Sequence, residues 1–550
     1  MGDPNGSQRE SANTSNQGGL AKVLRVRDIW ALGVGIVVCG QYFGWNLGLK
    51  DNGPIAMLIA SLLVCLLFTG WVLTLSELAV ALPTAGGPMD YGMQAGGRWL
   101  GLLMGWSMFL ECLFGGVATA LASGGYIAFL FNPADPDVRV TVIAGIATIL
   151  VFFLLQAYGV REQARVLNWM IYAALFGLVI FWVAAGSSFQ WERIWTSPVL
   201  PESKGWTAVI DAIPFALWWL IIIEGAALAA EETQRPNRTL PRGLTLAVLT
   251  VTIMVALTTI TACGAHPSQE IAIKGERDVE YPLAEVIRHV PAGSSPLLLY
   301  SFGIVAICGL VASYHGLLFG AGRQLFALGR AGFGPAAIGH VHPRRATPIT
   351  SLAICSVVTA GFVASTLYFK GSIMTLAVLV AGFAALVLYI LSMICLLRLR
   401  RLNPLMFRAY RAPFKWGLPA AIIVLSAIAL IAYPRIDRDG VLPLAFCLYA
   451  GGIVLFLLYR RHPGNASKLE AAAHATQMPE EITAVGSALL HRIAGTSLVI
   501  GIGGAIAIAF AALGVGSGDW FHSQISIAIV LLATTLAVVL LSVVALRRLR

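Results

Sequence analysis

The chain has 550 residues, of which 58% are hydrophobic and 12% are charged, and its mean hydropathy is +0.79. A soluble protein of this length needs more charge to cover its surface, so the composition excludes a soluble enzyme or binding domain. The net charge of +10 would suit a nucleic-acid-binding protein, but the placement of that charge along the chain, described below, argues against this function.

Apolar runs of about 20 residues, each long enough to cross a bilayer core of roughly 30 Å, recur along the whole chain. Residues 1–24 come before the first run; they are mostly polar and predict a disordered cytoplasmic tail without a signal peptide. The rest predicts an all-α polytopic membrane protein with about fourteen spans, near residues 28–48, 54–82, 98–131, 138–158, 163–186, 208–231, 241–263, 296–322, 347–369, 373–398, 417–434, 440–459, 493–515 and 523–546.

Positive charge is distributed unevenly between the two sides of these spans. With the N-terminal tail in the cytoplasm, 27 of the 37 Lys and Arg residues fall on the cytoplasmic side and 10 on the outer side, whereas acidic residues show no such bias. This is the positive-inside pattern, and it predicts an inner- or plasma-membrane protein with both termini in the cytoplasm. The excess of basic residues therefore reports topology, and no nucleic acid partner is expected.

Two spans have a polar or glycine-bearing centre between apolar halves. They are the first, with "GVGIVVCGQYFGWN" (residues 33–46), and the sixth, with "AIPFALWWLIIIEGAALAAEE" (212–232). A broken membrane helix frees backbone N–H and C=O groups, which must then face protein, water or a ligand. Because the first and sixth spans each open a group of five, the pair predicts inverted repeats with a binding site at the membrane midplane. For the first span, ordinary close packing through glycine is the alternative.

Three acidic residues lie within the spans, where a carboxylate costs a few kcal/mol or more unless it faces a cavity or a partner. Glu77 is near the cytoplasmic end of the second span and is expected to reach water there. Glu111 and Glu224 lie deeper, which indicates a functional role or, alternatively, a structural partner on another helix. The eight cysteines have no CxxC spacing, so neither a metal site nor a cofactor is predicted.

Five stretches resemble, in order, the amino acid–polyamine–organocation transporter superfamily. They are the first-span motif, "ALPTAGGPMDYG" (81–92), "AAEETQRPNRTLPRG" (229–243), "GRQLFALGRAGFGPAAIGHVHPRRATP" (322–348) and "NPLMFRAYRAPF" (403–414). Within the superfamily the chain is most similar to ethanolamine permeases, on the strength of "GQYFGWN" (40–46), "EGAALAAEE" (224–232), "ASYHG" (312–316) and "RAGFGP" (330–335).

The resemblance implies a leucine-transporter-like core of five plus five inverted spans over residues 25–400. Spans 11 and 12 would occupy residues 401–460, followed by a polar cytoplasmic linker (461–492) and by two extra spans with a basic tail (493–550). The cationic amino acid transporter branch also has fourteen spans.

Three positions depart from the relatives. Gln41 replaces a carboxylate of the ethanolamine permease pattern, and Ile222 stands where many relatives have glycine. The fifth span lacks the lysine that proton-coupled relatives often carry.

The resemblance places the substrate between the two breaks. The candidate substrate-binding residues are Cys39, Gly40, Gln41, Tyr42, Phe43, Glu111, Trp219, Ile223, Glu224 and Gly225, with Cys39–Gln41 expected at the unwound turn and Tyr42 and Phe43 expected to face the pocket. Two carboxylates without an intramembrane lysine or arginine need protons, a metal ion or a cationic ligand. Glu224 is therefore expected to pair with a substrate ammonium and Glu111 to carry the coupled proton. Glu111, Ser313 and His315 are the ion-coupling candidates, and packing is the alternative role for the aromatic residues and for His315.

These features predict a secondary transporter that imports a small amine or amino acid, ethanolamine-like and proton-coupled, by alternating access. A cationic or broad-specificity amino acid permease or exchanger is the first alternative, and a non-transporting membrane sensor is the second. The expected partners are the small-molecule substrate, a proton or other coupling ion, and the lipid bilayer. No enzymatic motif is present in the sequence, and the oligomeric state is left open.

Overall fold

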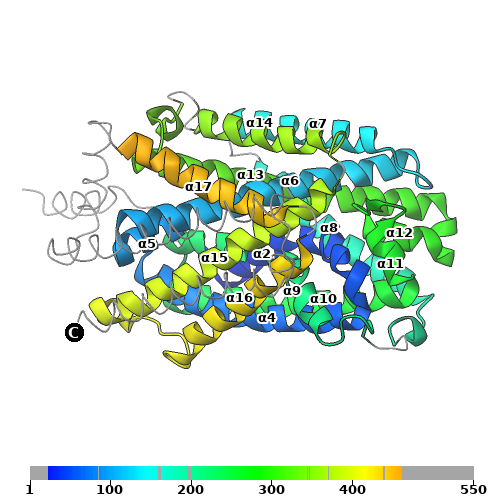
Figure 1. The fold of residues 1–550 in the computed structure, drawn as a ribbon, viewed down its shortest axis with the longest axis horizontal. Coiled ribbons are helices and arrows are strands. Elements are labelled where there is room, and N and C mark those ends of the chain that lie inside the picture. Colours follow the sequence, from blue (N-terminus) through cyan, green and yellow to red (C-terminus); the bar gives the residue numbers. More distant parts are fainter. Residues whose placement is uncertain are drawn as a thin grey trace, which may run out of the picture.

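A computed structural model describes residues 23–460 of the chain, apart from residues 85, 159–162, 196–199, 343, 344, 346, 370, 438 and 439. The predicted linker over residues 461–492 and the two predicted C-terminal spans lie outside the described residues. The described chain is built from long helices that run side by side (Figure 1).

The first half of the described chain contains the first to sixth predicted spans. Its elements are α2 (Val26–Val37), α3 (Cys39–Tyr42), η1 (Trp45–Gly48), α4 (Leu49–Ala81), α5 (Pro88–Gly96), α6 (Arg98–Phe131), α7 (Val138–Tyr158), α8 (Gln163–Gly186), η2 (Trp191–Arg193), α9 (Thr207–Ala216), η3 (Leu217–Trp219) and η4 (Ile223–Glu232).

The second half contains the seventh to twelfth predicted spans. Its elements are α10 (Pro236–Ala265), α11 (Ser268–Ala272), β1 (Ile273–Lys274), β2 (Arg277–Asp278), α12 (Pro282–His289), η5 (Pro291–Ser294), α13 (Pro296–Arg330), η6 (Ala336–Gly339), α14 (Ile349–Ser365), α15 (Ile373–Leu402), η7 (Met406–Arg408), α16 (Gly417–Ile436) and α17 (Val441–Arg460). The two short strands pair antiparallel, with Ile273 opposite Asp278.

Local sequence explains where several helices begin. Proline is the first residue of α5, α10, α12 and α13, a position where its missing N–H has no helical partner to lose. Helix α15 begins at a serine cap instead, because the Ser372 hydroxyl accepts a hydrogen bond from the Thr375 N–H at 3.0 Å.

Nine helices in the described part of the chain are long and apolar enough to cross a membrane, and the bent pair Thr207–Trp219 and Ile223–Ala230 would make ten. Ile349–Ser365 is a shorter apolar helix of 17 residues, and helix α2 of the broken first span has 12 residues. The predicted helical membrane protein is confirmed at this level.

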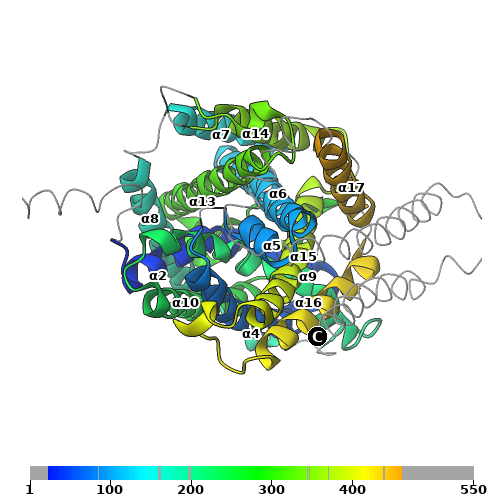
Figure 2. The same cartoon turned by 90° about the vertical axis from the view of Figure 1, so that its left-hand side faces the viewer.

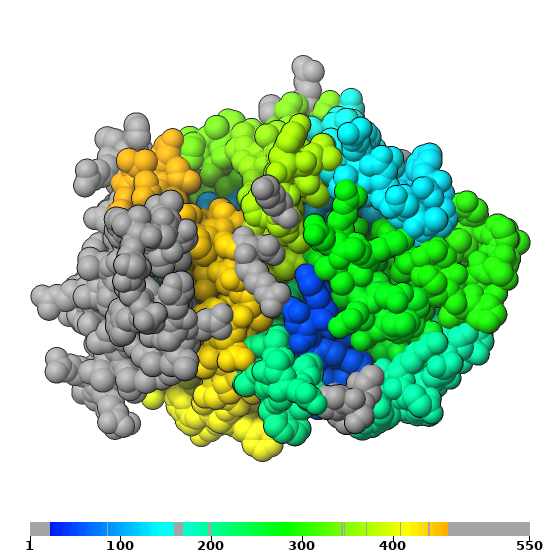
Figure 3. Space-filling model, turned by 45° about the vertical axis from the view of Figure 1, so that its right-hand side comes forward, coloured from blue at the N-terminus to red at the C-terminus, as the bar shows by residue number. Residues whose placement is uncertain are grey.

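The helices form a bundle whose two ends differ. Seen along its length, α6 and α15 lie toward the middle, and α7, α14, α16 and α17 lie at the periphery (Figure 2). We call the end that carries α5 the α5 end, and the end that carries α11, α12 and the β1–β2 hairpin the hairpin end (Figure 1). On the face in Figure 3, the N-terminal segment in blue reaches the surface only as a narrow patch between later elements.

At the α5 end, the segment before the first span is joined to the end of the sixth. Leu24 and Thr233 form a parallel β-bridge. The N–H groups of Val23 and Leu24 both donate to the Glu232 carbonyl at 2.9 Å, and the Gln234 N–H donates to the Leu24 carbonyl at 2.8 Å. The beginning of one predicted broken span is therefore tied by main-chain bonds to the end of the other.

Also at the α5 end, Glu77 of α4 lies in a buried ion pair, and the prediction that it reaches water is wrong. The carboxylate has no exposed surface and accepts hydrogen bonds from Arg400 Nε at 2.7 Å and Arg400 Nη2 at 2.5 Å. It also accepts the Ala412 N–H at 2.6 Å. This side chain therefore joins α4 to α15 and to the segment that follows α15.

Candidate substrate site

The first predicted span is broken, but not at the turn that the sequence predicted. Cys39, Gly40 and Gln41 belong to the short helix α3, and the unwound backbone is Phe43 and Gly44 instead. Phe43 is extended, and Gly44 has a φ of 91°, a conformation that side chains with a Cβ rarely adopt. The glycine that permits the break is therefore Gly44.

The sixth predicted span is also broken, as expected. Its two parts, Thr207–Trp219 and Ile223–Ala230, are bent by 44°. Between them Ile222 has a φ of 70°, in the left-handed region, where a β-branched residue is strained. The isoleucine at this position thus adopts the backbone conformation that glycine would adopt without strain.

The two broken segments lie directly against each other. A Cβ added to Gly40 would lie 2.6 Å from the Trp218 carbonyl oxygen and 3.2 Å from the Trp219 Cα. Only a residue without a side chain allows this approach of the two backbones. Gly40 therefore brings α3 into contact with the residues that precede the sixth-span break.

Glu111 of α6 and Glu224 of η4 meet beside the sixth-span break. Glu111 is fully buried and Glu224 is 2% exposed, and their carboxylates interact with each other. Oε1 of Glu111 accepts the Ile222 N–H at 3.2 Å. Within the described part of the chain, Oε2 of Glu111 and both carboxylate oxygens of Glu224 have no hydrogen-bond partner. The two carboxylates therefore lie in contact with each other and have no basic partner among the described residues.

Two aromatic residues complete this group. Trp71 of α4 and Tyr389 of α15 interact with the Glu224 carboxylate, and their rings lie 4.3 Å apart, centroid to centroid. Apart from this interaction with Glu224, neither the Trp71 indole N–H nor the Tyr389 hydroxyl has a hydrogen-bond partner among the described residues. We call Trp71, Glu111, Glu224 and Tyr389 the carboxylate cluster.

The polar and aromatic residues of the first break have other neighbours. The Gln41 Oε1 accepts the Thr258 hydroxyl at 2.9 Å, and the buried Nε2 has no hydrogen-bond partner in the part of the chain that the structure describes. The Tyr42 hydroxyl donates to the Ala174 carbonyl at 2.5 Å. The Phe43 ring packs edge-on against Trp218 at 5.1 Å. Gln41 and Tyr42 are thus engaged with α10 and α8.

Trp219 is also occupied by packing. Its ring stacks on Trp45 at 4.9 Å, and its N–H donates to the Ser61 hydroxyl at 2.9 Å. Ile223 is fully buried, and Gly225 lies against Ile36 of α2. These contacts place Trp219 against η1 and α4.

The ion-coupling candidates on α13 divide into two locations. The Ser313 hydroxyl is buried and interacts with the Cys39 thiol of α3. His315 faces α7 instead: its backbone carbonyl accepts Gln156 Nε2 at 2.8 Å, and its Nδ1 lies 3.2 Å from the same nitrogen. Ser313 therefore touches the first span, whereas His315 packs on the opposite side.

Sequence reasoning missed three residues that shape the site. Trp71 and Tyr389 are apolar-span aromatics with no local signal that they meet a carboxylate. Asn46 belongs to the "GQYFGWN" motif: its Oδ1 accepts the Gly44 N–H, and its Nδ2 donates to the Ile271 and Val279 carbonyls, each at 2.9 Å. The sequence did contain one signal for the role of Asn46: a polar side chain just after a predicted break needs hydrogen-bond partners when it is buried.

Comparisons with known proteins identify the family to which this chain is similar. A family model described as amino acid permease matches residues 28–458. The branched-chain amino acid permease of Bacillus subtilis (strain 168) is 23% identical over 82% of this chain and 96% of its own length. The methylthioribose transporter of the same organism is 25% identical over 80% and 94%. The vacuolar cationic amino acid transporter 2 of Arabidopsis thaliana is 26% identical over 67% and 59%.

Among solved structures, a variant of the manganese transporter of Eremococcus coleocola is similar in fold. The TM-score is 0.50 at 12% sequence identity, and the match covers 83% of this chain and 99% of that one. At this identity the similarity concerns the fold alone.

Proposed function

Because the chain belongs to the amino acid permease family, we propose that it is a secondary active transporter that imports a small, ethanolamine-like amine together with protons. The relatives are named permeases or transporters, and the chain is a transporter rather than an enzyme. The proposal includes a five-plus-five inverted-repeat core over residues 25–400, with both termini in the cytoplasm and alternating access across the cell membrane.

The observation that carries this proposal is the set of unpaired carboxylate oxygens in the carboxylate cluster. Neither Glu111 nor Glu224 has a Lys or Arg within ion-pair distance in the described part of the chain. A primary ammonium supplies three N–H donors and a positive charge, so one such ligand would satisfy the free oxygens and neutralise a carboxylate. The neighbouring Trp71 and Tyr389 suit a cation as well, because aromatic rings attract positive charge.

Backbone donors at the two breaks support an amine ahead of an ordinary amino acid. A substrate carboxylate would need free N–H groups there. The Gly44 N–H already donates to Asn46, and the Ile222 N–H already donates to Glu111. A substrate without a carboxylate does not need these N–H donors.

Proton coupling follows from the presence of two carboxylates beside one ammonium. The ammonium neutralises only one of them, and two buried carboxylates in contact cannot both stay charged without a large cost in free energy. We propose that Glu111 carries a proton while the ammonium is bound to Glu224, so that the proton and the amine move inward together, and that Oε1 of Glu111 continues to accept the Ile222 N–H.

Uptake into liposomes tests the proposal. The purified chain is reconstituted, and uptake of labelled ethanolamine, arginine and alanine is measured with and without a proton gradient. Ethanolamine uptake driven by the gradient is expected, with at least a tenfold loss in Glu224→Gln. Glu202→Gln is the matched control, since Glu202 is exposed between η2 and α9. Equal ethanolamine uptake by Glu224→Gln and the unchanged chain would contradict the ammonium role.

A cationic amino acid permease or exchanger is the second candidate. The same pair of buried carboxylates favours a basic side chain as ligand, and one relative is named for cationic amino acids. In the same assay, arginine uptake without ethanolamine uptake would select this function. Uptake that ignores the proton gradient would remove the coupling role of Glu111 and leave the amine site untouched.

A further inference from the structure

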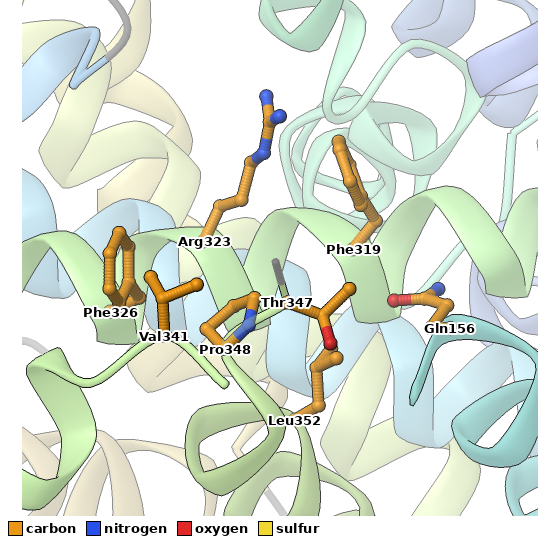
Figure 4. Close-up of a pocket in the computed structure, with 8 residues that line it drawn as sticks. All are labelled: Gln156, Phe319, Arg323, Phe326, Val341, Thr347, Pro348 and Leu352. Carbon is orange, nitrogen blue, oxygen red and sulfur yellow. The ribbon is translucent and has the colours of Figure 1, made fainter. Parts of the chain in front are cut away.

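A second candidate site lies outside the carboxylate cluster, in a cavity of about 180 Å³ between α13, α7, α14 and the segment before α14 (Figure 4). Its lining residues are Gln156, Phe319, Arg323, Phe326, Val341, Thr347, Pro348 and Leu352. A cavity of this size holds several water-sized molecules and has room for a small polar head group.

Two residues that line this cavity carry buried oxygens without partners among the described residues. Gln156 is 2% exposed and Thr347 is 6% exposed, and neither Gln156 Oε1 nor the Thr347 hydroxyl makes a hydrogen bond within that part of the chain. The orientation of the Gln156 amide is fixed, because its Nε2 donates to the His315 carbonyl at 2.8 Å and a flipped amide would place two oxygens together. Oε1 therefore points into the cavity toward Thr347 (Figure 4).

An arginine stands at the rim of the cavity. Arg323 is exposed, and its guanidinium lies 4.2 Å from the centroid of the Phe319 ring. Glu232, at the end of η4, acts on it electrostatically, but the two form no ion pair within 4.0 Å among the described residues. The five donors of a guanidinium in a fixed fork match a phosphate group.

A second arginine lies close by. Arg345 stacks over Tyr158 at 4.4 Å and donates to the Ala157 carbonyl at 3.4 Å, next to Gln156 in the chain. Two helices that line the cavity also carry exposed apolar side chains, Leu154 on α7 and Val357 on α14. A ligand there would have an anionic group at the rim, a hydroxyl inside, and hydrocarbon alongside.

We propose that this cavity binds a phosphate group that carries a hydroxyl donor, supplied by the head group of an anionic phospholipid such as phosphatidylglycerol. The phosphate would lie on Arg323, and a head-group hydroxyl would donate to Gln156 Oε1 and bond the Thr347 hydroxyl. Clusters of basic side chains at the ends of membrane helices are the usual means of holding such head groups.

Thermal unfolding of the full chain in nanodiscs tests this proposal. Nanodiscs contain phosphatidylcholine alone or with phosphatidylglycerol, and a third sample adds glycerol 3-phosphate to phosphatidylcholine nanodiscs. We expect phosphatidylglycerol to raise the midpoint of unfolding by several degrees, and expect Thr347→Val and Arg323→Gln each to lose at least half of that shift. Native mass spectrometry should detect bound phosphatidylglycerol in the unchanged chain and less in both variants.

Two control variants separate this site from general surface charge. Thr350→Val changes an exposed threonine in the first turn of α14, three residues after Thr347. Arg401→Gln changes an exposed arginine near the end of α15, which stacks on Trp416. Both should keep the full shift. An equal shift in all variants, or no bound lipid, would overturn the proposal. A shift caused by glycerol 3-phosphate but not by phosphatidylglycerol would overturn the lipid source and keep the phosphate chemistry.

Discussion

The Ile222 N–H donates a hydrogen bond to Oε1 of Glu111 across 3.2 Å, so a carboxylate on α6 caps the break of the sixth span. This bond gives Glu111 a structural role that is separable from any role in proton transfer. An acceptor at this position is needed because a buried N–H without a partner costs about 1–3 kcal/mol.

The first prediction separates these two roles. Glu111→Gln retains an acceptor for the Ile222 N–H, whereas Glu111→Leu removes it. We expect Glu111→Leu to be less stable than Glu111→Gln by about 1–3 kcal/mol, measured by thermal unfolding in detergent. Both variants should lose the response of uptake to the proton gradient. Equal stability of the two variants would show that the N–H finds another acceptor.

The second prediction concerns the strain at Ile222. Its φ of 70° costs an L-residue roughly 1–2 kcal/mol, which glycine avoids. Ile222→Gly and Ile222→Ala both remove the side chain beyond Cβ, so Ile222→Gly should be the more stable by about 1 kcal/mol. At Ile221, which does not have a positive φ, Ile221→Ala should instead be more stable than Ile221→Gly. If the alanine variant were the more stable one at both positions, Ile222 would not be strained.

The third prediction concerns the buried pair of Glu77 and Arg400. Arg400→Met leaves a buried carboxylate without its cation, which costs about 3–5 kcal/mol. In the double variant Glu77→Gln/Arg400→Met, the glutamine still accepts the Ala412 N–H, and most of this loss should be recovered. Thermal unfolding measures both, and Arg401→Met, at an exposed arginine, serves as control. A double variant as unstable as Arg400→Met would contradict the expectation.

The fourth prediction concerns pH and the hairpin end. Burial lowers the pKa of His266 to about 4, and the neighbouring His289, stacked at 4.2 Å, adds to the shift. The unfolded chain binds this proton near pH 6.5 and the folded chain only near pH 4, so the free energy of unfolding decreases as pH falls through that window.

We therefore expect the midpoint of thermal unfolding to fall from pH 7 to pH 4.5, and to fall less in His266→Gln. His340→Gln, at an exposed histidine, should follow the unchanged chain. An identical pH dependence in all three proteins would exclude His266 as the titrating group.

Sequence patterns predicted the helical spans well because their signal is local. Residues 98–131 and 138–158 were predicted to the residue as α6 and α7, since length and hydropathy suffice to identify a membrane span. The break in the sixth span was also predicted, but the first was placed at residues 39–41 and lies at Phe43 and Gly44. The sequence contains glycine at 40 and 44, and only the backbone distinguishes close approach at the former from positive φ at the latter.

The candidate site was predicted only in part, because its neighbours come from distant segments. The sequence singled out Glu111 and Glu224 as costly in a membrane, and the structure brings them together. It gave no sign that Trp71 and Tyr389 would join them, since aromatic residues in apolar spans are usually packing. The ion pair of Glu77 was missed for the same reason: Arg400 is more than 300 positions away. The substrate roles of the candidate residues remain predictions.

The main-chain bridge between Leu24 and Thr233 constrains how the α5 end can open. Three backbone hydrogen bonds join these two segments. Separating the segments would leave the N–H and C=O groups of these bonds without partners until they found new ones. The start of the first span and the end of the sixth should therefore move together as one unit. A substrate released at this end would pass beside this unit, along the neighbouring helices, and not between the two joined segments.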